Sequence, residues 1–223
     1  VFKAFIAKNK SKTIVSRSRK VVLILSQYDV RLIRVQAEHL SLILRWRNND
    51  WVRKNMFVQD ILKEKDQLAW FNSINNASNY YFIIEYLGEK VGLIHAKNFS
   101  EEDGMGEGGI FIGEYDYLET WASVMASICL LNFIFAKTNI NRSMVRVQAH
   151  NRRAISYNLK LGYKIDYEDA NELRMILDKE DFLCKTTLLK SVLSKISKGQ
   201  DSLILEGEKA SNNINQINRL FEN

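Results

Sequence analysis

The chain has 223 residues, of which 46% are hydrophobic and 26% are charged, enough for one globular domain with a full core and a short appendage. Its formal net charge of +6 favours anionic partners, from phosphorylated small molecules to nucleic acid or a membrane surface, without choosing among them. Two widely spaced cysteines argue against a disulfide framework, and together with three scattered histidines they lack the spacing of metal ligands. We therefore expect a cytoplasmic globular protein without a metal site.

The two ends of the chain differ from its middle and set the expected domain boundaries. Residues 1–29 carry a cluster of lysines and arginines between Lys3 and Lys20, which we interpret as a basic N-terminal extension. Nucleic-acid binding by this arm is the weaker reading, because its charges have little aromatic interleaving. Residues 30–180 form the expected domain, and residues 181–223 form a helical and polar C-terminal appendage.

The hydrophobic pattern predicts alternating strands and helices. In chain order, we expect strands at 21–25 and 30–35, helices at 38–47 and 66–74, a hairpin at 81–86 and 91–96, a loop rich in glycine and acidic residues at 100–109, a strand at 110–113, a helix at 121–137, strands at 144–149 and 173–177 around a helix at 151–161, and a lysine-rich helix at 186–198. A candidate edge strand, "SLILEGE", and a tail, "NNINQINRLFEN", that is either a helix or unstructured complete the chain. This order predicts an α/β (α+β) domain with a mixed, mostly antiparallel sheet flanked by helices in three layers.

The longest apolar segment, residues 121–136, bears on a membrane role. It has 16 residues interrupted by polar side chains, whereas a membrane-spanning helix needs about 18–20 apolar residues. We expect a buried core helix at this place and no membrane partner.

The stretch "HNRRAISYNLKLGYK", residues 150–164, combines a strand end, a capped helix and a helix stop. Asn151 is a favoured N-cap residue, and Gly162 stands where a helix end favours a left-handed residue. Between them, apolar residues at helical spacing form a stripe that can pack on a sheet.

This stretch and an earlier passage resemble the GNAT superfamily of acetyl-CoA-dependent N-acetyltransferases. "VRLIRVQAEHLSLILRWRNNDWVRKNMF" is similar to the family's first strand and helix, with the "WRN…VRK" pattern of its sugar-modifying and ribosomal-protein-modifying branches. "VRVQAHNRRAISYNLKLGYK" is similar to the family's fifth strand and fourth helix. The resemblance covers residues 30–178 and implies a GNAT-like fold and an acyltransferase activity with acetyl-CoA as co-substrate.

The resemblance also implies where acetyl-CoA binds. A strand edge would pair with the amides of the pantetheine arm, and a loop leading into a helix N-terminus would hold the pyrophosphate. The cofactor-binding residues implied are Ile110, Phe111, Ile112 and Gly113 on the strand, Leu118, Trp121, Ala122 and Ser123 around the helix start, and Asn151 and Asn158 on the last helix. The backbone N–H near Ile112 would stabilise the oxyanion.

The sequence departs from the family pattern at two places. The pyrophosphate loop usually contains two glycines or a glycine and an alanine, but residues 118–123 contain no glycine and carry Glu119 and the bulky Trp121. In addition, Asn158 occupies the position of a tyrosine that returns a proton to the leaving thiolate in many relatives. Tyr157, one residue earlier and about 100° round the helix, is either a substitute acid or a core residue.

Acetyl transfer requires a deprotonated amine, and two residues are candidates for the base. Glu107 precedes the strand at 110–113, and His95 lies on the expected hairpin. The alternative for Glu107 is a solvated acid in a loop. The alternative for His95 is a histidine whose hydrogen bonds are all made within the sheet.

The passage with the "WRN…VRK" pattern indicates the acceptor. It looks most like that of enzymes that acetylate nucleotide-linked deoxysugars, such as the pseudaminic-acid-pathway enzyme. The substrate-binding candidates are Arg45, Arg47, Asn48, Arg53, Met56 and Phe57, because guanidinium groups suit phosphate oxygens and apolar side chains flank rings. A protein α-amine, a non-catalytic binding module on a GNAT scaffold, and a solvated helix end remain alternatives. A homodimer is one assembly compatible with these expectations.

Overall fold

The computed structural model describes residues 22–76, 78–100 and 102–207. Its strands are β1 (Ile24–Tyr28), β2 (Val30–Arg34), β3 (Tyr80–Tyr86), β4 (Glu89–Ser100), β5 (Met105–Ile112), β6 (Arg142–Gln148), β7 (Lys164–Glu168), β8 (Glu172–Asp178) and β9 (Gln200–Glu206). Its helices are α1 (Leu40–Asn48), α2 (Asp50–Arg53), α3 (Glu64–Ile74), α4 (Ala122–Lys137), α5 (Arg152–Leu161), α6 (Lys179–Lys185) and α7 (Thr187–Ile196), with short 3₁₀ turns at Ala37–His39 (η1) and Tyr115–Tyr117 (η2).

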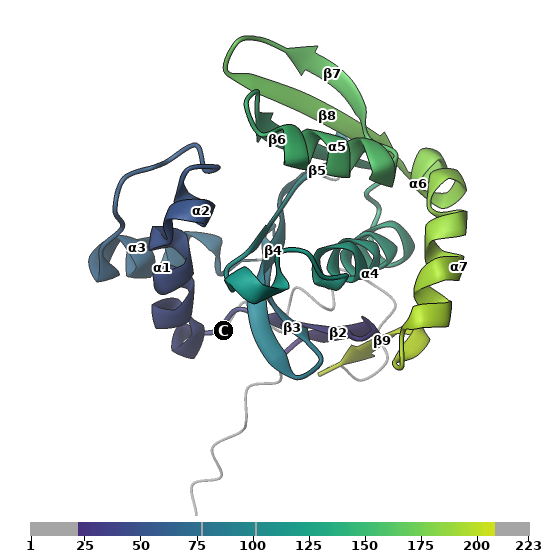
Figure 1. Ribbon diagram of the computed structural model, residues 1–223, viewed down its shortest axis with the longest axis horizontal. Helices are drawn as coiled ribbons and strands as arrows, with labels where there is room; N and C mark the ends of the chain where they lie inside the picture. Colours follow the sequence, from purple (N-terminus) through teal and green to yellow (C-terminus); the bar gives the residue numbers. More distant parts are fainter. Residues whose placement is uncertain (1–21, 77, 101, 208–223) are drawn as a thin grey trace, which may run out of the picture.

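The strands within this described part form one sheet in the order β7-β8-β6-β5-β4-β3-β2-β1-β9. Helices α1, α2 and α3 cover one face, and α4 lies on the other with α5, α6 and α7 beside it (Figure 1). The pairs are antiparallel except β5 with β6, which run parallel. The expected fold class, a mixed and mostly antiparallel sheet flanked by helices, is confirmed.

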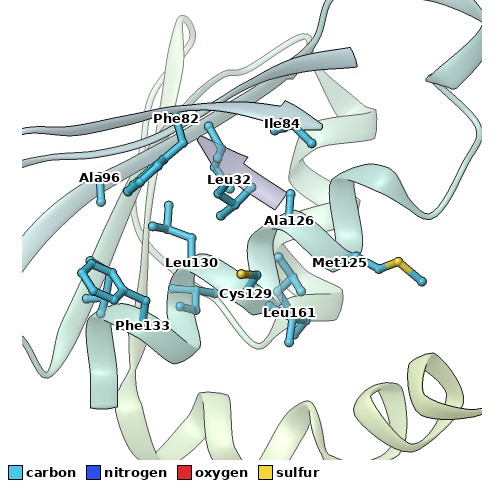
Figure 2. Packing of buried hydrophobic residues seen from close by; sticks show 14 of the residues in the cluster. Leu32, Phe82, Ile84, Ala96, Met125, Ala126, Cys129, Leu130, Phe133 and Leu161 are labelled. Atoms are coloured by element: carbon cyan, nitrogen blue, oxygen red, sulfur yellow. The ribbon is translucent and has the colours of Figure 1, made fainter. Parts of the chain in front are cut away.

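The main core lies between the sheet and α4. Apolar side chains recur all round α4, and the helix is buried along nearly its whole length. Figure 2 shows Leu32, Phe82 and Ile84 of the sheet facing Ala126, Cys129 and Leu130 of α4. A second cluster packs α1 and α3 on the opposite face around the fully buried Trp46. The segment expected to be a core helix is therefore a core helix, and no helix in the described ranges is long and apolar enough to cross a bilayer.

The glycine-rich segment 100–109, expected as a loop, is largely strand. β5 already begins at Met105, and two of its glycines, Gly106 and Gly109, lie against side chains of β4. A Cβ built on Gly109 would come within 2.4 Å of Cε1 of His95, and one on Gly106 within 2.6 Å of the ring of Phe99. The residues are glycine because neighbouring rings occupy the space of their side chains, a reason that sequence composition does not reveal.

The sheet extends beyond the expected domain range of 30–180 at both ends. Residues of β1 pair with β2 and with β9, and Leu23 and Leu25 are buried in the main core. β9 includes residues 202–206 of the candidate edge strand, whereas β7 and α6 were not anticipated. Most of the basic extension and the tail "NNINQINRLFEN" lie outside the described residues.

Candidate active site

The parallel strands β5 and β6 separate before either of them ends. Their register runs from Met105 opposite Arg142 to Gly108 opposite Val145, but β5 continues to Ile112 and β6 to Gln148. The amide of Gly113 donates to the carbonyl of Val91 at 2.8 Å, so alternate residues of β5 direct their backbone groups to β4. By this alternation, Ile110 and Ile112 direct their N–H and C=O groups towards β6, where the ladder has ended. The predicted cofactor strand thus has a free backbone edge.

The predicted pyrophosphate loop leads into the N-terminus of α4. The hydroxyl of Thr120 accepts from the amide of Ala122 at 3.3 Å, while the amides of Ser123 and Val124 donate to no group in the described part of the chain. Trp121 precedes the helix with its side chain 43% exposed. Two free amides at the start of a 16-residue helix suit an anion even without the glycines of the family pattern.

Glu119, which was expected to oppose an anion, has a partner. Nη1 of Arg153, on the first turn of α5, lies 2.7 Å from Oε1 of Glu119, and Nη2 of Arg153 donates to the carbonyl of Leu118. The arginine therefore offsets the carboxylate and ties the loop to α5. This compensation was invisible in the sequence because 34 positions separate the two residues.

The first and last turns of α5 are held as the sequence indicated. Oδ1 of Asn151 accepts from the amide of Ala154 at 3.1 Å, and Gly162 ends the helix with φ of 102°. Nδ2 of Asn151 donates to no group in the described ranges. Asn158 instead donates through Nδ2 to the carbonyl of Ala154 at 2.9 Å.

Tyr157 packs between α5 and α4. Its hydroxyl lies 2.7 Å from Oγ of Ser127 and 2.9 Å from the carbonyl of Ser123. Burial raises the pKa of Tyr157 well above its ordinary value, so the phenol stays protonated. This position ties the two helices together, which is what the core interpretation of Tyr157 predicts.

The two candidate bases lie on the face of the sheet that α1 and α3 cover. The carboxylate of Glu107 contacts Nζ of Lys97 at 3.0 Å and Nδ2 of Asn98 at 3.4 Å, and its side chain remains 16% exposed. The ring of His95 stacks on Tyr81 with 4.7 Å between centroids. Burial, with the charges of Lys97 and Arg47, lowers the pKa of His95 to about 3, so the imidazole is neutral at ordinary pH.

Three of the predicted acceptor-binding residues have partners inside the protein. Arg45 forms an ion pair with Glu114 at 2.5 Å, and Arg53 forms one with Asp50 at 2.5 Å. The amide group of Asn48 exchanges two hydrogen bonds of 2.9 Å with the backbone of Leu62. These side chains shape α1, α2 and the following loop.

The other three predicted acceptor-binding residues are Arg47, Met56 and Phe57. Arg47 is half-buried, makes no hydrogen bond or ion pair within the described residues, and has its pKa lowered by burial. The guanidinium of Arg146 lies 4.7 Å from the ring centroid of Phe57, and Nε2 of Gln148 donates to the carbonyl of Met56 at 2.8 Å. The loop after α2 thus reaches β6 at the point where β5 and β6 have separated.

Sequence reasoning missed several residues of this site, namely Tyr81, Arg146, Gln148, Arg153 and Glu114. Arg146 and Gln148 alternate with the buried Val145 and Val147, so the strand pattern placed them on one face. Nothing in the sequence indicated which residues lie opposite that face.

The chain matches a family model described as an acetyltransferase (GNAT) domain over residues 29–164, more than half of its length. The comparison with curated proteins found no match. Among solved structures, the chain is similar to apo FdhC, described as a nucleotide-linked sugar GNAT, with a TM-score of 0.64, 22% identity, and coverage of 75% of this chain and 97% of that chain.

Two further structures are similar. A spermidine N-acetyltransferase from Vibrio cholerae, solved with CoA and spermine, has a TM-score of 0.62 and 15% identity, with 70% of this chain and 98% of that chain covered. RimL, a ribosomal L7/L12 alpha-N-protein acetyltransferase solved with coenzyme A, has a TM-score of 0.60 and 10% identity, with 70% and 97% covered. At these identities the structural likeness establishes the shared fold. With the family match, the conclusion is that this chain belongs to the GNAT family and is an acyltransferase with acetyl-CoA as its co-substrate.

Proposed function

We propose that this enzyme acetylates an amino group of a nucleotide-linked amino sugar. The observation that carries the proposal is the unpaired, half-buried Arg47 on the acceptor side of the sheet. Part burial of a cation without a partner has a desolvation cost, and an anionic acceptor would reduce that cost. Arg146 and Lys97 lie on the same face, where they are ion-paired with Glu172 and Glu107. A polyamine, which is itself cationic, would offer Arg47 no counter-charge.

The described residues fit acetyl-CoA at two places. The free edge of β5 at Ile110 and Ile112 offers donors and acceptors to the amides of the pantetheine arm, and the free amides of Ser123 and Val124 offer donors to the pyrophosphate. Acetyl-CoA supplies the activated acetyl thioester.

The chain's own residues then assist direct attack by the amine on the thioester carbonyl. Glu107 would accept the proton of the amine, directly or through a water, because its carboxylate lies on this face of β5, three residues before Ile110 at the free edge. The N–H of Ile112 would donate to the oxyanion as charge develops on the carbonyl oxygen. Neutral His95 and its stacked partner Tyr81 would orient the acceptor.

The test is a panel of amines assayed for release of the coenzyme A thiol from acetyl-CoA. We expect turnover with UDP-linked or dTDP-linked amino sugars, and not with spermidine or with an N-terminal peptide of a ribosomal protein. Arg47→Met should raise KM for the sugar nucleotide by about tenfold or more, since an ionic hydrogen bond is lost. Glu107→Gln should mainly lower kcat, by about 10²-fold or more.

Arg31→Met is the matched control, because Arg31 is an exposed arginine at the other end of the sheet. Efficient turnover of spermidine or of the peptide would replace the proposed acceptor. An unchanged KM in Arg47→Met would remove Arg47 from the acceptor site.

A further inference from the structure

The three residues that follow β5 are each held by side chains of α1 and α2 or of the turn between them. Nδ2 of Asn49 donates to the carbonyl of Gly113 at 3.2 Å, and the indole of Trp51 meets the ring of Tyr115 edge-on at 5.7 Å. Between them, Glu114 contacts both Arg45 and Trp46. These contacts join the helices of the acceptor side to the end of the cofactor strand.

Trp46 is the centre of this junction. Its side chain is fully buried, and a Cβ built on Gly113 would lie 2.1 Å from Cγ of the indole, so the ring packs directly on the backbone of Gly113. The indole N–H of Trp46 donates to Oε1 of Glu114 at 2.7 Å. A buried indole N–H needs an acceptor, and a carboxylate is a strong one.

Glu114 also lies between the two parts of the chain that face acetyl-CoA. On one side is the free edge of β5 at Ile110 and Ile112, and on the other is η2, which leads to the N-terminus of α4. The amides of Gly113 and Glu114 both donate to the carbonyl of Val91, which holds this segment on β4. A shift of Glu114 would therefore move the last backbone groups of the free edge.

We propose that Glu114 is a positioning residue for acetyl transfer: by accepting from Trp46 and Arg45, it holds the end of β5 in the position in which its free edge can pair with the pantetheine arm. In this role it would act through the backbone of β5 and not by touching either substrate. This role of Glu114 rests on acetyl-CoA as the donor and not on the proposed acceptor. The role of Glu114 and the identity of the acceptor can therefore be disproved independently.

The test is calorimetric titration of the full chain with acetyl-CoA and, separately, with 3′-phospho-ADP, the part of coenzyme A that lacks the pantetheine arm. Glu114→Ala should raise Kd for acetyl-CoA by about tenfold, in line with the loss of a hydrogen bond to a charged group, and change Kd for 3′-phospho-ADP by less than about twofold. Glu114→Gln keeps an acceptor for the indole N–H and should restore most of the affinity for acetyl-CoA.

Two further variants separate positioning from general stability. Glu85→Ala removes another carboxylate that is ion-paired with an arginine, at 2.7 Å from Arg31, but away from β5, and should leave both Kd values unchanged. Trp46→Phe keeps a ring over Gly113 while removing the N–H, and should weaken acetyl-CoA binding even if Glu114→Ala does not fold. The proposal would be overturned if Glu114→Ala raised Kd for acetyl-CoA and for 3′-phospho-ADP by the same factor. It would also be overturned if Kd for acetyl-CoA were unchanged in both Glu114→Ala and Trp46→Phe.

Discussion

At the scale of single residues, the environment of a side chain decides its role more than its type does. His95 and Glu107 were equal candidates for the base in the sequence. The structure stacks His95 on Tyr81 and lowers its pKa to about 3, chiefly by burial. Likewise, Arg45 and Arg47 are two residues apart, yet one is ion-paired with Glu114 and the other has no partner in the described part of the chain.

The lowered pKa of His95 makes stability depend on pH. The ordinary value is 6.5, so between about pH 6.5 and 3 the unfolded chain binds more protons than the folded chain, and the free energy of unfolding falls as pH falls. Burial also lowers the pKa of His39, which acts in the same direction. We expect urea unfolding to give a smaller free energy at about pH 5 than at pH 7, and His95→Gln to flatten this slope.

The exposed His150 provides the control for that measurement. In His150→Gln, the free energy of unfolding should fall with pH as steeply as in the original protein. A slope that is the same in His95→Gln and the original protein would show that His95 is not the group responsible.

At the scale of elements, α5 shows which features of a helix can be predicted from its own sequence. Its N-cap, its apolar stripe and its terminal glycine were all readable, because each acts within the helix itself. By contrast, residues 105–109 of β5 were taken for a loop, since the rings that lie against Gly106 and Gly109 belong to β4. Elements defined by their own residues were predictable, and an element defined by its neighbours was not.

The cap residue Asn151 allows structure and binding to be separated. Asn151→Ala should lower the free energy of unfolding by about 1 kcal/mol through the lost cap, and should also raise Kd for acetyl-CoA. Asn151→Asp keeps an oxygen for the amide of Ala154 but loses the Nδ2 donor. We therefore expect thermal unfolding near that of the original protein with weakened acetyl-CoA binding in calorimetry. Full affinity in Asn151→Asp would remove Nδ2 from the proposed coenzyme site.

At the scale of the whole molecule, β9 places the C-terminal elements against the first strand. A polar chain runs from Lys190 to Asn132 at 3.1 Å, from Asn132 to Gln27 at 2.9 Å, and from Gln27 to the carbonyl of Asp201 at 2.7 Å. It joins α7, α4, β1 and β9. Without β9 the backbone edge of β1 would be exposed, and exposed edges promote association.

Gly199 is the tightest point of this junction. A Cβ at Gly199 would lie 1.6 Å from the carbonyl oxygen of Tyr28, and backbone cannot move aside as a flexible side chain can. Gly199→Ala should lower the free energy of unfolding by about 1–3 kcal/mol, measured by thermal or urea unfolding. The neighbouring Lys198→Ala, at an exposed position, is the control and should unfold like the original protein. Equal stability of both variants would mean that β9 does not hold Gly199 against β1.

The sequence by itself determined the fold class, the order of most elements, the GNAT resemblance and the ends of α5. These properties depend on hydrophobic period, on caps and on glycine at a left-handed position, all of which act over a few residues. Only the tertiary structure decided which of the predicted site residues form hydrogen bonds or ion pairs within the protein. It also decided that Arg153 offsets Glu119, and that Trp46 and Glu114 join α1 to the end of β5. The last two contacts join residues 34 and 68 positions apart, and their energies depend on distance and burial in the folded chain, which no local pattern records.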